Sequence, residues 1–207
     1  MRYFFGLFTA SVCSFIIASH AFALDFDKAE GISEKELRAS LTRNAKLSTA
    51  QVDSILVALK KQLNMGESEI LPIQGYLYAH GMNGALFVDH DVWSFDATLK
   101  APGSDELIDI PDLFICDFHN GGIKFEIAYK WMFTFIPRGV HATELHGGIY
   151  GRGIGVVFDP VLGFEGSWMP AQNRPHDLIH IALKLGVGAG IVFPRMEFKM
   201  RPIGDLP

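Results

Sequence analysis

The chain has 207 residues, 49% of them hydrophobic, and its 18 basic and 23 acidic side chains give a net charge of −5. This length and apolar content suffice for one domain of ordinary size with an appended element. The acidic balance does not favour nucleic acid or an anionic membrane surface as the natural partner.

The beginning of the chain has the features of an export signal. Arg2 precedes an apolar run from Tyr3 to Ala18, and Ala21-Phe22-Ala23 follows as a small-x-small cleavage pattern. The run is shorter than the ~20 residues that a bilayer span needs, and no basic cluster follows it. We therefore expect residues 1–23 to be a signal peptide and the mature protein to be periplasmic or secreted, without a transmembrane span. A retained membrane anchor is the alternative.

The two cysteines of the chain bear on its redox chemistry. Cleavage of the signal removes Cys13 and leaves Cys116 alone, so no intramolecular disulfide can form. The apolar neighbours Leu113-Phe114-Ile115 favour burial of the remaining thiol. An intermolecular bond is the alternative.

Two helix starts follow the signal. Ser33 with Glu36 three residues later has the pattern of a capping box and predicts a helix over about 34–45. The same device recurs at Ser48 and Gln51, and it predicts a second helix close behind the first.

The second helix is expected over about 49–64. Its apolar residues keep one stripe at helical spacing, and Gly66 can end the helix. We expect the two helices to stack as a hairpin that occupies residues 24–66.

This hairpin, continued through "GESEILPIQGYLYA", resembles the opening helical hairpin and first strand of the small histone-like DNA-binding proteins of bacteria. The resemblance covers roughly 45 residues and lies in two capped helices, a Gly-Glu turn and a glycine before aromatic residues. It implies a DNA-binding module. Residues 24–65 hold 7 basic and 6 acidic side chains, however, and no basic β-arm follows them. Phosphate neutralisation has no obvious source here, so we expect no nucleic-acid partner.

From Ile70 onward the pattern changes to the period of two that is typical of β-strands. In "IKFEIAYKWMFTF" (123–135), aromatic and aliphatic residues occupy the odd positions, and Lys, Glu and smaller residues occupy the even ones. We expect the odd positions, such as Trp131, to be buried and the even positions, such as Lys130, to face solvent.

Several further short strands are predicted, separated by Gly, Pro and Asn-Gly turns. Short spacing between strands favours antiparallel pairing. The predicted fold class is therefore α+β, with a short N-terminal helical hairpin followed by a mainly antiparallel β-sandwich or small β-barrel over residues 67–207.

Two glycine-rich segments, "GRGIGVV" (151–157) and "GVGAGIVF" (186–193), lack the features of a dinucleotide site, because no helix follows either of them. We expect no cofactor. Alternate glycines on a strand let another backbone or an aromatic ring approach closely. Exported glycine-rich β domains of lipid-binding and envelope-maintenance type are loosely similar.

Histidines are the candidates for metal chemistry. His176 and His180 are four residues apart, so on a helix they could share one zinc ion, whereas on a strand they would lie about 13 Å apart. The apolar alternation that starts at Ile179 favours the strand, and we expect no metal shared by this pair. The alternative is a histidine-metal hydrolase that uses some of His119, His141, His146, His176 and His180.

No nucleophile-elbow motif occurs, and we favour a binding protein over an enzyme. The leading interpretation is an exported, non-catalytic envelope protein whose β domain binds an apolar or amphipathic ligand, such as a lipid, or another envelope protein. The candidate ligand-binding residues are aromatic: Tyr129, Trp131, Phe133 and Trp168. Ligand identity and oligomeric state stay open at this level.

Overall fold

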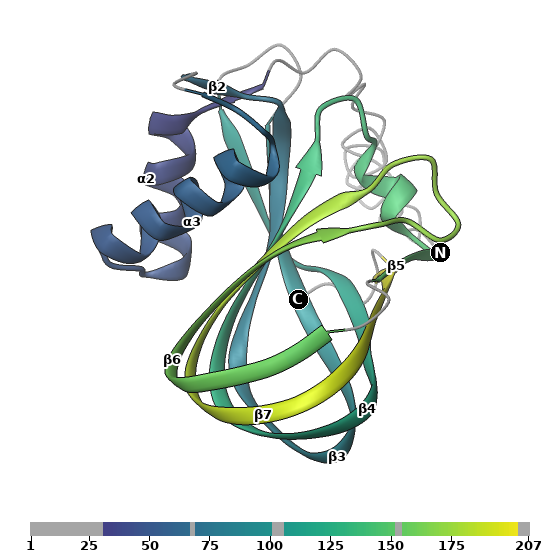
Figure 1. The fold of residues 1–207 in the computed structure, drawn as a ribbon. Coiled ribbons are helices and arrows are strands. Elements are labelled where there is room, and N and C mark those ends of the chain that lie inside the picture. Colours follow the sequence, from purple (N-terminus) through teal and green to yellow (C-terminus); the bar gives the residue numbers. More distant parts are fainter. Residues whose placement is uncertain (1–30, 67–68, 101–105, 152–154, 203–207) are drawn as a thin grey trace, which may run out of the picture.

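The computed structural model describes residues 31–66, 69–100, 106–151 and 155–202 (Figure 1). It is a mainly antiparallel β structure with two α-helices, so the α+β prediction is confirmed. The predicted signal peptide, residues 1–23, lies outside the described residues.

The helices α2 (Glu34–Ala45) and α3 (Thr49–Gln62) begin where the sequence predicts. The Ser33 hydroxyl accepts a hydrogen bond from the backbone N–H of Glu36, and the Glu36 carboxylate accepts one from the backbone N–H of Ser33. A second capping box is present at the start of α3. Each box satisfies two backbone N–H groups that a helix end would otherwise leave unpaired, so both predicted helix starts are confirmed.

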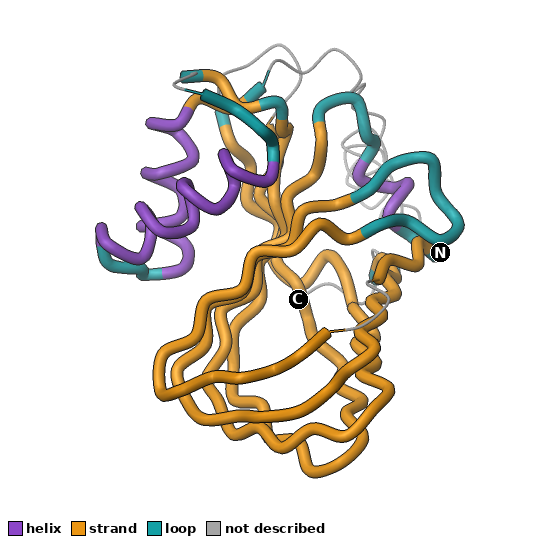
Figure 2. Tube along the Cα trace, in the orientation of Figure 1, coloured by secondary structure: helices purple, strands orange, loops and turns teal. Residues whose placement is uncertain are grey.

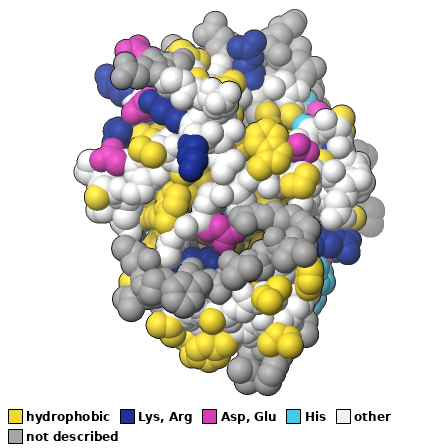
Figure 3. Space-filling view, viewed as in Figure 1, with side chains coloured by type: hydrophobic (Ala, Val, Ile, Leu, Met, Phe, Trp, Pro, Cys, Tyr) yellow, Lys and Arg dark blue, Asp and Glu magenta, His cyan; other side chains and the backbone are white. Residues whose placement is uncertain are grey.

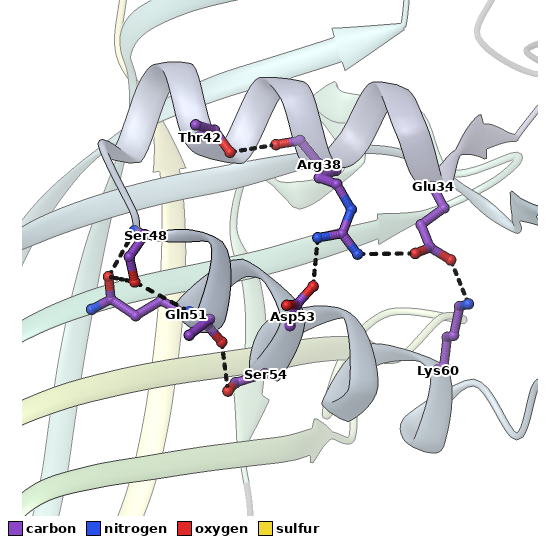
Figure 4. Close-up of polar contacts among 9 residues, drawn as sticks. Glu34, Arg38, Thr42, Ser48, Gln51, Asp53, Ser54 and Lys60 are labelled. Atoms are coloured by element: carbon purple, nitrogen blue, oxygen red, sulfur yellow. Dashed lines mark hydrogen bonds and ion pairs between the residues drawn. The ribbon is translucent and has the colours of Figure 1, made fainter.

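Charged side chains hold the two helices together (Figure 4). Arg38 of α2 donates to Asp53 of α3 at 2.5 Å and to Glu34 of its own helix at 3.2 Å. Lys60 of α3 donates to the other carboxylate oxygen of Glu34 at 2.5 Å. These contacts fix the hairpin in one arrangement.

Five strands form the main sheet, in the order β3-β4-β7, with β5 and β6 both pairing with β7. All pairings are antiparallel. Within the described residues β3 and β6 do not pair, so the pairing defines neither two packed sheets nor a closed barrel. The strand bounds are β3 (Ile73–Lys100), β4 (Leu107–Pro137), β5 (Gly148–Gly151), β6 (Gly155–Met169) and β7 (Leu178–Met200), and a separate pair joins β1 (Ile32–Ser33) to β2 (Ile70–Leu71).

The strands are longer than the sequence suggests. The Asn83-Gly84 pair, expected as a turn, lies inside β3, and Gly121-Gly122 lies inside β4. The prediction of several short strands separated by these turns is therefore wrong. The glycines fall where the strands curve rather than where they end, and the strong curvature is visible in the lower half of Figure 1.

The curvature folds β3 back on itself, so that its two ends face each other. A Cβ added at Gly81 would lie 3.0 Å from the Trp93 ring, twelve residues further along the same strand. Asn83 also donates a hydrogen bond to Asp91. We call the concave side of the sheet its inner face and the convex side its outer face.

Two apolar cores result from this curvature. The first lies on the inner face and includes Phe95, Phe114, Met132 and Phe198. Cys116 belongs to this core and is fully buried, as predicted, and burial raises the pKa of its thiol well above the usual value. Its neighbours therefore keep the thiol protonated and shielded.

The second core lies between the helical hairpin and the outer face of the sheet. Leu37 and Ile55 from the helices pack with Tyr76, Phe133 and Ile181 from the strands. Figure 2 shows the helices beside the upper part of the sheet only. The lower part of the outer face is left without a covering element from the described chain.

Candidate functional site

The uncovered part of the outer face is apolar and exposed. Below the hairpin, the outward positions of β4 and β7 hold large apolar side chains that are roughly half exposed or more, from Phe125 at 46% to Ile123 at 70%. Cross-strand partners such as Ile127 and Val187 belong to this surface. We call it the outer apolar face and define it as Ile123, Phe125, Ile127, Leu185, Val187, Ile191 and Phe193.

The opposite, inner face at the same level is charged and buried. Glu126 is completely buried, and Lys124, Lys130 and Lys184 are each at most 6% exposed. The Glu126 carboxylate pairs with Lys130, with Lys124 at 3.5 Å and with Lys184 at 3.4 Å. Because buried charges are tolerated only when they are paired, the inner face can hold these four charged side chains only in such a paired arrangement.

The predicted orientation of the 123–135 strand is therefore wrong for its even positions, which are buried along the whole strand, and for its first three odd positions, which are exposed. Phe133 and Phe135 are buried, as predicted, because the hairpin covers them. Ile123, Phe125 and Ile127 share their side of β4 but lie beyond the hairpin, where nothing in the described chain covers them. Even-numbered residues are buried instead, because the sheet curves around them.

Glycines on β7 make this curve possible. A Cβ at Gly186 would lie 2.1 Å from the carbonyl oxygen of Ile127, and a Cβ at Gly190 would lie 2.5 Å from that of Ile123. No side chain fits at such distances, so β7 can follow the bend of β4 only with glycine on its inner face. This confirms that alternate glycines here admit close approach of another backbone.

The predicted ligand-binding residues occupy different surroundings. Tyr129 and Trp131 are partly buried, and their rings lie 4.6 Å apart between the outer apolar face and the hairpin. Phe133 is completely buried beneath the helices, whereas Trp168 of β6 is 48% exposed. The Trp168 indole N–H donates to Asp177 at 2.7 Å.

A groove of about 680 Å³ lies between α3 and the adjoining strands β6 and β7. Val57 and Lys61 line it from the helix, and Phe164 and Leu183 line it from the strands. Gln62 donates to the backbone carbonyl of Gly166 in β6 at 3.2 Å and holds the end of α3 against the sheet. Leu183 precedes Leu185 on the same side of β7, so the groove lies next to the outer apolar face.

His176 and His180 do not form a helical pair. His180 lies on the inner face of β7, and His176 precedes the strand by two residues, so the predicted strand is confirmed. His180 Nδ1 is 3.0 Å from the Thr134 hydroxyl. His176 Nε2 is 2.9 Å from the Tyr150 hydroxyl, and burial lowers the pKa of His176 and raises that of Tyr150 to about 12. Both groups are therefore neutral at pH 7.

The other candidate metal ligands lie in separate contacts. His141 Nδ1 is 2.9 Å from the Thr143 hydroxyl, and His146 Nδ1 accepts from the backbone N–H of Met200 at 3.1 Å. The ring of His119 stacks on a neighbouring histidine. Among the described residues, no group of three or more His, Cys, Asp or Glu side chains is placed to hold a metal ion.

Sequence reasoning missed the outer apolar face and the charged cluster beneath it. A signal for both is present in "IKFEIAYK" and "LGVGAGIVF". One side of each strand holds aliphatic and aromatic residues, and the other side is mostly charged in the first segment and mostly glycine in the second. Glycine on one side of a strand marks that side as concave, which exposes the other side.

Comparison of the chain with protein-family models, with curated proteins and with solved structures finds no match. In the described part of the chain, neither helix is long and apolar enough to cross a membrane.

Proposed function

We propose that the protein is an exported, non-catalytic binding protein of the cell envelope whose outer apolar face binds lipid or another amphipathic ligand. The single observation that supports this most is the inverted distribution of side chains at the bend. Charges are buried there and large apolar groups are exposed, although a soluble surface normally has the reverse.

The size of the outer apolar face supports a binding role. Its seven side chains are between 46% and 70% exposed, which amounts to on the order of 700 Å² if a large apolar side chain offers roughly 200 Å². The largest apolar patch of a typical monomer is about 300–600 Å². Figure 3 shows several exposed apolar side chains on the lower half of the molecule, and others on its upper half.

The chemistry of this face favours lipid over a protein partner. Outward positions 121–127 of β4 and 185–193 of β7 hold no polar side chain, so the face offers no side-chain hydrogen bond. Protein interfaces usually contain such polar contacts, whereas hydrocarbon chains need none. Tyr129 and Trp131 border the face, and these residue types suit a boundary between apolar and aqueous surroundings.

Flotation of the purified protein with zwitterionic phosphatidylcholine vesicles tests the proposal. The wild type should float with the vesicles, and an Ile127→Ser/Val187→Ser double variant should bind at least about tenfold more weakly, because two adjacent apolar groups are lost. Both side chains are about half exposed, so the variant should retain its fold, which circular dichroism checks.

Val92→Ser provides a matched control. Val92 is 61% exposed on β3, and its cross-strand partner on β4 is Asp117 rather than an apolar residue. This variant should bind vesicles as the wild type does. A folded wild type that ignores vesicles would overturn the lipid proposal and favour a protein partner. If the double variant binds vesicles as strongly as the wild type, another surface is responsible for vesicle binding.

A further inference from the structure

The groove beside α3 has two properties that together define a ligand class. Its volume of about 680 Å³ falls within the usual 300–1,000 Å³ of small-molecule sites. Most of its lining is apolar, and Val57 in its wall is 69% exposed although it lies beside Phe164 and Leu183. An apolar chain would therefore find contacts along the groove that water cannot provide.

The charges at the groove are unequal. Asp53 and Lys61 both line it, and they are eight positions apart, which corresponds to about 12 Å along α3. Asp53 is paired with Arg38 at 2.5 Å, which neutralises its charge. In the described chain the Lys61 ammonium has no hydrogen-bond or ion-pair partner, whereas its neighbour Lys60 is paired with Glu34. One end of the groove thus offers an uncompensated positive charge.

We infer that this groove binds a single-chain anionic amphiphile of the fatty-acid class, with the acyl chain along the apolar lining and the carboxylate at Lys61. This inference rests on the proposed function, because it names one ligand for the same apolar region. The carboxylate at Lys61 would lie away from Asp53, and Leu183 in the groove wall is two residues from Leu185 of the outer apolar face, on the same side of β7. A chain arriving on that face could therefore enter the groove.

Calorimetric titration of the protein with dodecanoate, below the micellar concentration of dodecanoate, tests the inference. We expect saturable binding of one molecule per chain, and weaker binding of dodecyltrimethylammonium, which has the same chain and the opposite charge. Lys61→Glu should weaken dodecanoate binding by about tenfold, because an attraction becomes a repulsion. Val57→Asp should weaken it as well, through lost apolar contact and added negative charge.

The control is Lys35→Glu, which makes the same charge change on the exposed surface of α2, away from the groove lining. It should bind dodecanoate as the wild type does. Equal affinity for the two amphiphiles, equal effects of Lys61→Glu and Lys35→Glu, or an absence of saturable binding would each overturn the inference.

Vesicle flotation separates this inference from the proposed function. If the wild type floats with vesicles but does not bind dodecanoate, the groove assignment fails alone. If the wild type binds dodecanoate but not vesicles, the outer-face proposal fails alone. If Ile127→Ser/Val187→Ser loses vesicle binding and keeps dodecanoate binding, both stand as separate sites.

Discussion

Lys130 and Glu126 form an ion pair within a single strand, although they lie four residues apart on β4. In a straight strand such residues would be about 13 Å apart. The concave bend of the sheet brings the two side chains together on the inner face, and the same bend leaves Ile127, between them in sequence, exposed on the outer face. The buried charges and the outer apolar face are therefore two sides of one structural feature.

Removing the central carboxylate of the buried cluster should destabilise the protein strongly. Glu126→Gln removes the negative charge that the buried Lys124, Lys130 and Lys184 share, and Lys184 keeps a second contact with Glu165 at 3.5 Å. Breaking a buried pair in this way costs about 3–5 kcal/mol, which urea denaturation measures. Glu197→Gln is the control. Among the described residues Glu197 pairs with the exposed cations Arg195 and Lys199, so its loss should cost less than about 1 kcal/mol. Equal losses in both variants would contradict the structural role of the cluster.

The same cluster predicts acid sensitivity. Burial by itself would raise the pKa of Glu126, but attraction to Lys130 and Lys184 outweighs it and holds the pKa below the ordinary value of 4.5. A carboxyl group with a lowered folded-state pKa contributes stability above its unfolded pKa and loses it as pH falls through the folded value. The urea concentration at the denaturation midpoint should therefore decrease as the pH is lowered below about 4.5. This decrease should be steeper in the wild type than in Glu126→Gln. Parallel pH profiles would show that Glu126 is not the titrating group.

Gly186 and Gly84 provide a matched test of the bend. Gly186→Ala would place a Cβ 2.1 Å from the backbone oxygen of Ile127, whereas a Cβ at Gly84 meets nothing within 4 Å. We expect Gly186→Ala to cost about 1–3 kcal/mol or more, as overpacking does. Gly84→Ala should be nearly neutral. Thermal denaturation of both variants measures the difference, and similar melting temperatures would show that the close approach of β7 to β4 is not required.

The parts of the fold that depend on residues close together in the sequence were predictable from it. Ser33 and Ser48 each form a hydrogen bond with a residue three positions away, so the pattern alone locates the helix starts. Cys116 is buried because its apolar neighbours are, and the antiparallel pairing follows from the period of two and the short spacing between strands.

The orientation of each strand face was not predictable in the same way. Lys130 and Trp131 alternate as expected, but which of them is the more buried depends on the direction in which the sheet bends and on how far the hairpin reaches. Both depend on residues distant in sequence, such as Gly186 and the helices. The candidate site was missed for that reason: an exposed Phe125 and a buried Phe133 have the same local pattern.

Zinc titration tests the last alternative, the histidine-metal hydrolase. The wild type and a His176→Ala/His180→Ala double variant should give the same calorimetric response, without stoichiometric tight binding. The two rings already have hydrogen-bond partners on two different strands: His176 contacts Tyr150 of β5, and His180 contacts Thr134 of β4. Zinc binding needs two ring nitrogens at about 2.1 Å from one ion, and β7 carries only His180 of the pair. One zinc per wild-type chain, lost in the double variant, would overturn this prediction and restore the hydrolase.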